Sequence, residues 1–174
     1  STSPWKTIQH AANSVSSGSK VVVLSGDYTS QGRINIIKSG SESSPIIFET
    51  DGTVKTKGFT IFNAATWQKI DYVTINGFEI ITTEDDAING PGIVVAGEGI
   101  ILENNYIHDT KKQGIYVYSD EATSSRNIII QNNNIKNTGP AASMDGVGIL
   151  IFNTNAFDNI ISGNTVSNAG HVGI

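Results

Sequence analysis

The sequence contains no cysteine, which excludes structural disulfides and thiolate-bound metal sites. Charged residues make up only 16% of the chain, and the formal net charge of −5 leaves no basic surface of the kind that binds nucleic acid. No uninterrupted apolar run is long enough to span a bilayer. We therefore expect neither a nucleic-acid partner nor a membrane-spanning segment.

In place of these features the sequence carries a repeat, whose copies follow one another at nearly equal intervals. One position of the repeat holds only glycine or asparagine, at Gly77, Asn104, Asn132 and Gly163. These two residue types accept a left-handed backbone most readily, so the position predicts a sharp bend between short strands. Before the repeat begins, the triplet Asp51-Gly52-Thr53 predicts a turn after a strand at Ile46–Glu49.

The position after the bend is Phe78 in the first copy and asparagine in the later copies, at Asn105, Asn133 and Asn164. If the copies are stacked, these asparagines form a ladder in which each amide bonds the backbone of its own and the neighbouring coil. Repeats of this length cannot bury their apolar face alone and must stack on their neighbours. The sequence therefore predicts an all-β fold, a parallel β-helix, as a single domain over residues 1–174.

The N-terminal segment, 1–20, differs from the rest and predicts a short capping helix. Ser3 is a candidate N-cap, and Pro4 suits the first helical position. Apolar residues then recur on one helical face, at Ile8, Ala11, Ala12 and Val15. We expect this helix to cover the open end of the coils that follow over residues 21–174.

The opposite end shows no comparable cap, because Gly173 and Ile174 fall inside an expected strand. An open end of stacked parallel strands exposes apolar side chains and strand edges. We therefore expect that the chain is a piece of a longer protein, or that this C-terminal coil associates end to end with another molecule.

The segments Ser3–Ala12, Val21–Tyr28 and Ser44–Phe48 resemble the opening of a large group of right-handed parallel β-helix proteins. That group includes pectate-lyase-like polysaccharide lyases and relatives of alginate lyases and epimerases. The resemblance implies a right-handed coil and an extracellular or cell-surface location, which also suits the asparagine-rich, lysine-poor composition of a secreted bacterial protein. It further implies an acidic polysaccharide as partner, with β-elimination as the reaction if the chain is an enzyme. Catalytic residues of the group commonly lie in central or later coils, so we expect this segment by itself to be inactive.

Variable connections between the repeats predict the functional surface, because solenoids collect insertions on their binding face. These connections are Thr82–Pro91, Ser119–Arg126 and Thr138–Asp145. Asp120 and Asp145 are separated by close to one repeat length, and with Glu121 they are candidate ligands for Ca²⁺, which prefers carboxylate oxygens. Asp145-Gly146 matches only part of the carboxylate motif of calcium-dependent pectate lyases, and the alternative interpretation of Asp145 is a turn.

Basic residues near these connections are candidates for catalysis, namely Lys112, Arg126 and His171. An exposed surface or turn position is the alternative for each of them. His108 and Asp109 are adjacent, and adjacent residues on a strand point to opposite faces, so no dyad is expected there.

Tyr116 and Tyr118 alternate with Ile115 and Val117, which predicts that the two tyrosines lie outside the core. With Asp120 they form a candidate saccharide-binding patch, and ordinary cross-strand packing is the alternative. Two functions remain open from the sequence. One is a carbohydrate-binding or carbohydrate-processing β-helix that acts on acidic polysaccharide. The other is a non-catalytic surface protein, adhesin or filament-forming spacer.

Overall fold

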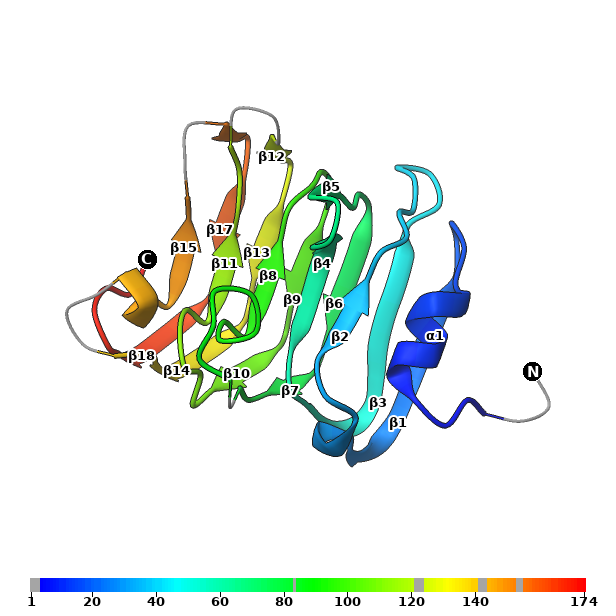
Figure 1. Ribbon diagram of the computed structural model, residues 1–174, viewed down its shortest axis with the longest axis horizontal. Coiled ribbons are helices and arrows are strands. Elements are labelled where there is room, and N and C mark those ends of the chain that lie inside the picture. Colours follow the sequence, from blue (N-terminus) through cyan, green and yellow to red (C-terminus); the bar gives the residue numbers. More distant parts are fainter. Residues whose placement is uncertain (1–3, 83, 121–123, 141–143, 153–154) are drawn as a thin grey trace.

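A computed structural model of the chain describes residues 4–82, 84–120, 124–140, 144–152 and 155–174. The strands stack along a common axis, with the N-terminal helix at one end and the C-terminus at the other (Figure 1). The stack has about five turns, and strands of successive coils pair in parallel with matched register. The all-β parallel β-helix predicted from the repeat is confirmed.

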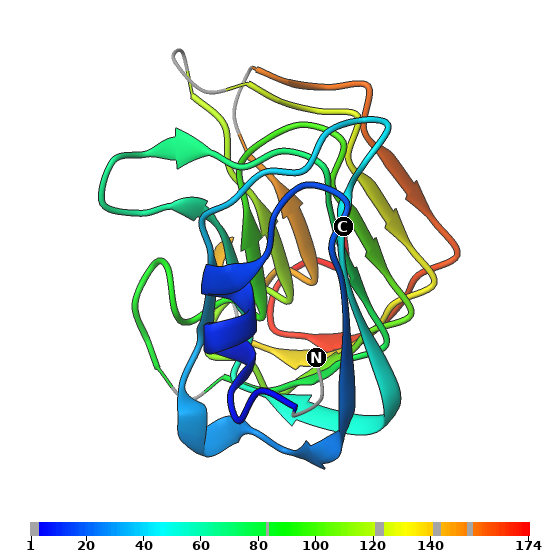
Figure 2. The ribbon, with the colours of Figure 1, turned by 90° about the vertical axis from the view of Figure 1, so that its right-hand side faces the viewer.

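In the described part of the chain the coils have three faces, which meet at bends when the stack is viewed end on (Figure 2). The first face contains β6 (Val73–Asn76), β9 (Ile101–Glu103), β13 (Ile129–Gln131) and β17 (Ile160–Ser162). The second contains β7 (Glu79–Ile80), β10 (Tyr106–His108), β14 (Asn134–Thr138) and β18 (Thr165–Ala169). The third contains β2 (Ile34–Ile36), β4 (Phe59–Asn63), β8 (Ile93–Val95), β11 (Ile115–Val117) and β15 (Ile149–Ile151).

Shorter elements complete the coils. β1 (Lys20–Asp27) pairs with β3 (Ile46–Thr56), which is long enough to pair with β6 through its first half and β7 through its second. β5 (Gln68–Lys69) forms an antiparallel hairpin with β4, and β12 (Ser125–Arg126) pairs with β16 (Ala156–Phe157). Single 3-10 turns occur at η1 (Thr29–Gln31) and η2 (Met144–Gly146).

The turn predicted at Asp51-Gly52-Thr53 is wrong, because β3 continues through it. Gly52 does adopt a left-handed backbone, with φ 86°, but β1 pairs with β3 on both sides of it. The pairing register shifts between Leu24 and Gly26 of β1, so the irregularity is a bulge within paired strands. Tertiary pairing therefore overrides the local turn signal.

The predicted bend is confirmed, since its four residues all have positive φ, at Gly77, Asn104, Asn132 and Gly163. A second column of positive-φ residues, not singled out from the sequence, precedes the first face at Tyr72, Gly99, Asn127 and Asp158. A third follows the second face at Asp109, Asn137 and Asn168. The coil turns at each of these columns.

The asparagine ladder is also confirmed. Asn105 Nδ2 donates to Asn133 Oδ1 at 3.0 Å, and Asn133 Nδ2 donates to Asn164 Oδ1 at 2.9 Å. Each of these oxygens also accepts from the backbone N–H of the previous coil, and the ladder starts where Asn105 Oδ1 accepts from Phe78 N. Asn105 and Asn133 are each 1% exposed, so the ladder satisfies polar groups inside the protein.

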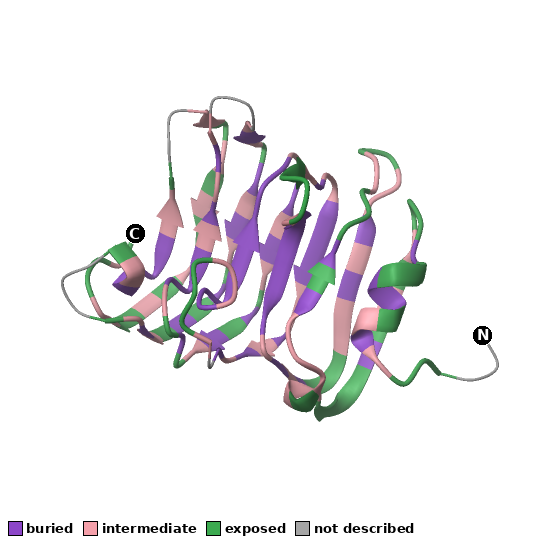
Figure 3. Cartoon of the chain, in the orientation of Figure 1, coloured by how far each residue is buried: buried purple, intermediate pink, exposed green. Residues whose placement is uncertain are grey.

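The buried core runs along the axis from α1 to β15, and the last coil adds only the partly buried Ile161 and Val166 (Figure 3). Residues in register on the second face fill it, with Ile80, Ile107 and Ile135 fully buried. The glycine that precedes β4, β8, β11 and β15 on the third face allows this packing. A Cβ at Gly114 would lie 2.5 Å from Ile135 Cγ2 and 2.6 Å from the carbonyl oxygen of Gly148. The recurrent Gly-Ile pair is therefore required by the close approach of successive coils.

The capping helix forms, but its predicted start is wrong. α1 (Ile8–Ser14) begins after Thr7, whose Oγ1 accepts from His10 N at 3.1 Å, so Thr7 is the N-cap. Pro4 precedes the helix, and Ser3 lies outside the described residues. Thr7 has the extended backbone that a cap needs, which places the start one turn later than the proline suggested. No helix in the described ranges is long and apolar enough to cross a membrane.

Candidate functional site

The outer side of the third face carries a group of aromatic side chains. We call it the aromatic face, and its members are Phe62, Trp67, Tyr116, Tyr118 and Phe152. Ile115 and Val117 of β11 are fully buried, and Tyr116 and Tyr118 lie on the other side, as the alternation predicted. The strand register sets Phe62, Tyr118 and Phe152 at one level across the coils, with Ala96 between the first two.

The rings of the aromatic face are in contact with one another. Trp67 stacks on Phe62 with centroids 5.7 Å apart and meets Tyr118 at 5.4 Å. Tyr118 contacts Tyr116 edge to face at 6.2 Å, and Tyr116 contacts Phe152 in the same way at 6.3 Å. These separations are typical of favourable aromatic pairs. A continuous apolar path therefore crosses the coils.

One end of this path opens into a cavity of about 210 Å³, which we call the lysine pocket. Its lining residues are Ala87, Lys112, Gln113, Tyr116, Met144, Asp145, Leu150 and Phe152. Tyr116 and Phe152 belong to both the pocket and the aromatic face. Gln113 Nε2 donates to the carbonyl oxygen of Met144 at 2.7 Å, which holds η2 against the start of β11. The pocket thus has one charged end and one aromatic end.

Lys112 supplies the cation of this pocket. Its Nζ lies 2.8 Å from Asp145 Oδ2 and 3.8 Å from Asp85 Oδ1, and its side chain is 16% exposed. The hydrogen bond that Lys112 donates to Asp145 raises the pKa of Lys112, so the ammonium stays protonated at neutral pH. Burial likewise raises the pKa of Tyr116, which keeps its hydroxyl a proton donor. Lys112 is therefore a fixed positive charge and not a ready base.

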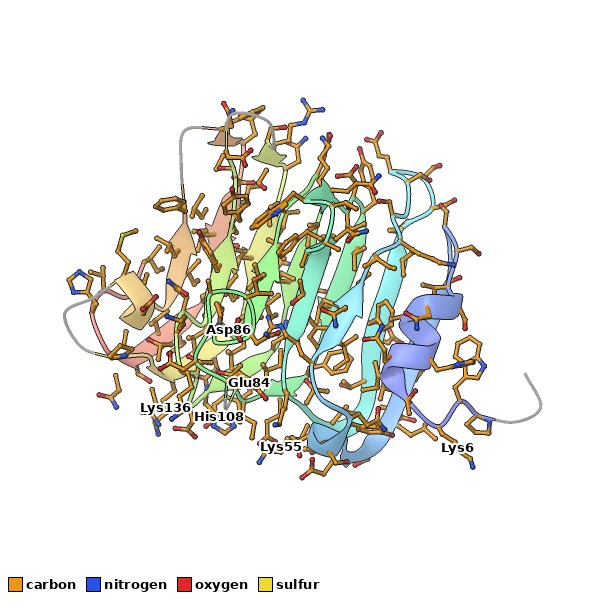
Figure 4. The ribbon with its side chains drawn as sticks, in the orientation of Figure 1. Lys6, Lys55, Glu84, Asp86, His108 and Lys136 are labelled. Carbon is orange, nitrogen blue, oxygen red and sulfur yellow. The ribbon has the colours of Figure 1, made fainter. Side chains whose placement is uncertain are left out.

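Hydrogen bonds order residues 84–91 of the connection that bears Ala87, beside the pocket. Asp86 accepts hydrogen bonds from the backbone N–H of Ile88 and Asn89, at 2.9 and 2.8 Å. Arg33 reaches across the stack and donates to the carbonyl oxygen of Pro91 at 2.7 Å. Burial lowers the pKa of Arg33 to about 9, which still leaves it charged at neutral pH. Figure 4 labels Glu84 and Asp86 on this connection, in front of the strands.

The structure separates the residues predicted to bind Ca²⁺. Ile115 pairs with Ile149, so Asp120 follows β11 at one end of the third face while Asp145 precedes β15 at the other. Their spacing in the sequence therefore does not make them neighbours across the stack, because the connections differ in length. Tyr118 Oη donates to Asp120 Oδ2 at 2.8 Å. Glu121 lies outside the described residues, and within the described ones no three histidine or carboxylate side chains gather as a metal site would require.

The predicted catalytic candidates are likewise spread over the molecule. Arg126 lies in β12, pairs with Glu98 at 2.8 Å, and has its pKa raised by that hydrogen bond. His171 lies in the last coil, where its backbone N–H donates to the carbonyl oxygen of Gly146. Of Lys112, Arg126 and His171, only Lys112 lines the lysine pocket. A catalytic role for any of the three stays a prediction.

A second polar cluster lies on the outer side of the second face, where Figure 4 labels Lys55, His108 and Lys136. His108 Nδ1 lies 2.7 Å from Asp109 Oδ2, and its Nε2 lies 3.2 Å from Glu79 Oε1. The expectation that His108 and Asp109 point apart is wrong, because Asp109 has left the strand at a bend with φ 51°. This cluster is distinct from the lysine pocket.

Trp67 and Phe152 belong to the candidate site and were not identified from the sequence as site residues, whereas Asp85 is one of the acidic residues of the variable connections. Trp67 lies in the β4–β5 hairpin, which interrupts the repeat, so no periodic signal marks it. Phe152 follows β15 at the level of Tyr118, and that register could have identified it. Asp85 approaches Lys112 only through the shape of the 82–91 connection.

Comparisons with known proteins agree with this architecture. The family model of the right-handed β-helix region matches residues 8–174. An alginate lyase from Paenibacillus sp. str. FPU-7 superimposes with a TM-score of 0.70 at 21% identity, covering 93% of this chain and 56% of that one. A mannuronic-acid-specific polysaccharide family 6 lyase from human gut microbiota has a TM-score of 0.57 at 12% identity, covering 88% and 47%.

The chain thus spans about half the length of these solved lyases, and the likeness at such identities concerns the fold. A search of curated proteins finds no significant match. The matched family model covers almost the whole sequence, including every coil described above. The chain therefore belongs to the right-handed β-helix family.

Proposed function

We propose that this chain binds an acidic polysaccharide along the third face, with a uronate carboxylate at Lys112 and sugar rings on the aromatic face. The observation that carries the proposal is the junction of the lysine pocket with the row of aromatic rings. Saccharides present carboxylates at their edges and apolar C–H groups on their ring faces. A charged pocket continuous with aromatic rings suits both.

The chemistry of Lys112 supports a binding role. An ammonium has three N–H donors, so Lys112 can keep its bond to Asp145 and also donate to an added carboxylate. Charge-assisted hydrogen bonds of this kind are the stronger ones in proteins. The chain as a whole carries a net charge of −5, which opposes a polyanion, so binding is expected to depend on local contacts or on a bridging cation. Ca²⁺ is the cation that the family resemblance implies, and an extracellular location is part of the same proposal.

Cleavage requires more than this pocket supplies. In β-elimination a base removes the proton α to the uronate carboxylate, and an acid protonates the leaving oxygen. Tyr116 can donate a proton, and Lys112 can neutralise the carboxylate, but Lys112 is held protonated by Asp145. We therefore expect the chain to bind acidic polysaccharide without appreciable turnover, although the two solved structures compared above are named as lyases.

The test measures binding of alginate and polygalacturonate by titration calorimetry, with and without Ca²⁺. Replacing Lys112→Gln should weaken binding by about tenfold or more, since hydrogen bonds to charged groups contribute roughly 1.5–3 kcal/mol. Lys136→Gln removes a lysine from the second face and should leave the affinity unchanged. Equal affinities for the two variants, or no binding by the unmodified chain, would refute the proposal.

The non-catalytic scaffold remains the second candidate. The last coil exposes the apolar residues Ile160 and Ile174, and end-to-end association through it stays a prediction. Electron microscopy and light scattering of the same preparation separate the two functions. Filaments together with absence of saccharide binding favour the scaffold. Monomers that bind alginate, with or without unsaturated product absorbing in the ultraviolet, favour the carbohydrate function.

A further inference from the structure

Trp67 combines an exposed ring with an unfavourable backbone. Trp67 lies in the β4–β5 hairpin, where its backbone φ is 55°. Bulky residues rarely adopt this conformation. Such a residue costs roughly 1–2 kcal/mol relative to glycine at the same place. The residue is nevertheless 53% exposed, so burial recovers only part of that cost. Strain that is retained in this way is a recognised mark of a functional position.

The hairpin around Trp67 is organised so that the ring is presented to solvent above the third face. Asn63 Oδ1 accepts from Ala65 N at 3.1 Å, and Asn63 O accepts from Thr66 N at 3.2 Å, which closes the turn. The indole then rests on Phe62 beneath and on Tyr118 of a coil further along the stack. At the level of these two supports the coil between them carries the small residue Ala96. Trp67 therefore spans the position of Ala96 and leaves about half of its side chain exposed.

Trp67 is also connected to the lysine pocket. The indole centroid lies 5.4 Å from that of Tyr118, and the Tyr118 centroid lies 6.2 Å from that of Tyr116, which lines the pocket. The path runs obliquely across the coils, from the end of the face that carries Lys112 to the end that carries the hairpin. A ligand that reaches both must be an extended one.

We propose that Trp67 forms a sugar-stacking subsite that binds a later ring of the same acidic polysaccharide whose uronate carboxylate is held at Lys112. This proposal rests on the proposed function and adds a direction and a length requirement to it. The ligand is an oligosaccharide that runs from the lysine pocket over Tyr116 and Tyr118 to the hairpin. A single uronate fills the pocket and does not reach Trp67.

The left-handed backbone offers a variant that removes the ring without harming the fold. Asparagine accepts a left-handed backbone such as that of Trp67 more readily than tryptophan does, so in Trp67→Asn the relief of backbone strain offsets part of the packing lost on Phe62 and Tyr118, and the variant should remain folded. Binding of uronate mono- and oligosaccharides of increasing length is measured for the parent, Trp67→Asn and Lys112→Gln. For the parent, affinity should rise with length. In Trp67→Asn the longest oligosaccharides should lose about tenfold in affinity, as expected for one lost aromatic stack, while the monosaccharide is unaffected. In Lys112→Gln affinity should fall at every length.

The outcomes separate this inference from the proposed function. If Lys112→Gln weakens binding and Trp67→Asn matches the parent at every length, the subsite is refuted and the binding site at Lys112 stands. If the parent binds no uronate ligand, the proposed function fails and the subsite fails with it. If Trp67→Asn weakens all lengths equally, the ring supports the pocket and is not a separate subsite.

The chain has two tryptophans, so replacing one allows the fluorescence of the other to be measured alone. Trp5, the other one, is half exposed and packs edge to face on His10 at the N-terminal end. In a Trp5→Phe variant the fluorescence reports Trp67 alone. A saturable change with long acidic oligosaccharides, at the affinity measured by calorimetry, supports the subsite. Binding without any change in emission would overturn it.

Discussion

The asparagine ladder and the aromatic face differ in how far their side chains are exposed to solvent. Asn105 and Asn133 are 1% exposed, and the hydrogen bonds of their amides lie within the protein. Trp67 is 53% exposed, and the Lys112 ammonium lines an open pocket. Groups satisfied internally stabilise the coil and leave nothing for a ligand, whereas partly exposed groups can exchange partners. One side of each coil therefore holds the stack together, and the other is available for recognition.

The largest loss of stability is expected from Asn133→Ala, in the asparagine ladder. The change leaves the buried backbone N–H of Asn105 without its partner and removes the amide bond to the carbonyl oxygen of Leu102. We expect the free energy of unfolding to fall by roughly 3 kcal/mol, since each unsatisfied buried group costs about 1–3 kcal/mol. Denaturant unfolding measures it. Asn134→Ala, at the neighbouring exposed position, serves as control, and equal losses in the two variants would show that the ladder contributes little.

Gly114→Ala tests the close approach between coils that brings the third face against the second. Its Cβ would meet Ile135 and the carbonyl oxygen of Gly148, so we expect a loss of about 1–3 kcal/mol, as for other overpacked cores. Gly173→Ala occupies the same place in the last coil, where the nearest atom is 3.9 Å away, and should change stability little. Thermal unfolding of both variants decides the point. Similar midpoints for the two would contradict the steric account.

The smallest change in stability is expected when the pH is lowered, and it should be confined to the 82–91 connection. Hydrogen bonds from the side-chain amide and backbone N–H of Asn89 lower the pKa of Asp86 below its ordinary value of 3.8. A lowered carboxyl pKa stabilises the folded state above pH 3.8, and this contribution disappears as pH falls through the folded value. The protection of the Ile88 and Asn89 amides against exchange, relative to their intrinsic rates, should therefore decrease as pH falls through the folded pKa of Asp86. An Asp86→Asn variant should lack the pH dependence, and unchanged protection at acid pH in the parent would argue against this role of Asp86.

The structure of residues that repeat could be predicted from the sequence, whereas the contacts between residues of the variable connections could not. Gly77, Asn104 and Asn133 were identified because each position recurs once a coil with a clear backbone or hydrogen-bonding requirement. Tyr116 and Tyr118 were placed outside the core because strand alternation is a local property. The cap of α1 and the continuation of β3 were mispredicted because competing local signals are decided by neighbouring elements.

The sequence by itself determined a stack of coils with a polar ladder at one bend, because a short repeat with one left-handed residue and one buried amide has no other way to satisfy its backbone and apolar side chains. The tertiary structure alone decided which loop residues meet. Lys112 pairs with Asp145, Asp120 lies far along the face from it, and Trp67 reaches Tyr118 across a coil. These side-chain contacts depend on the lengths of the connections and on the register between strands, and neither produces a repeating pattern in the sequence.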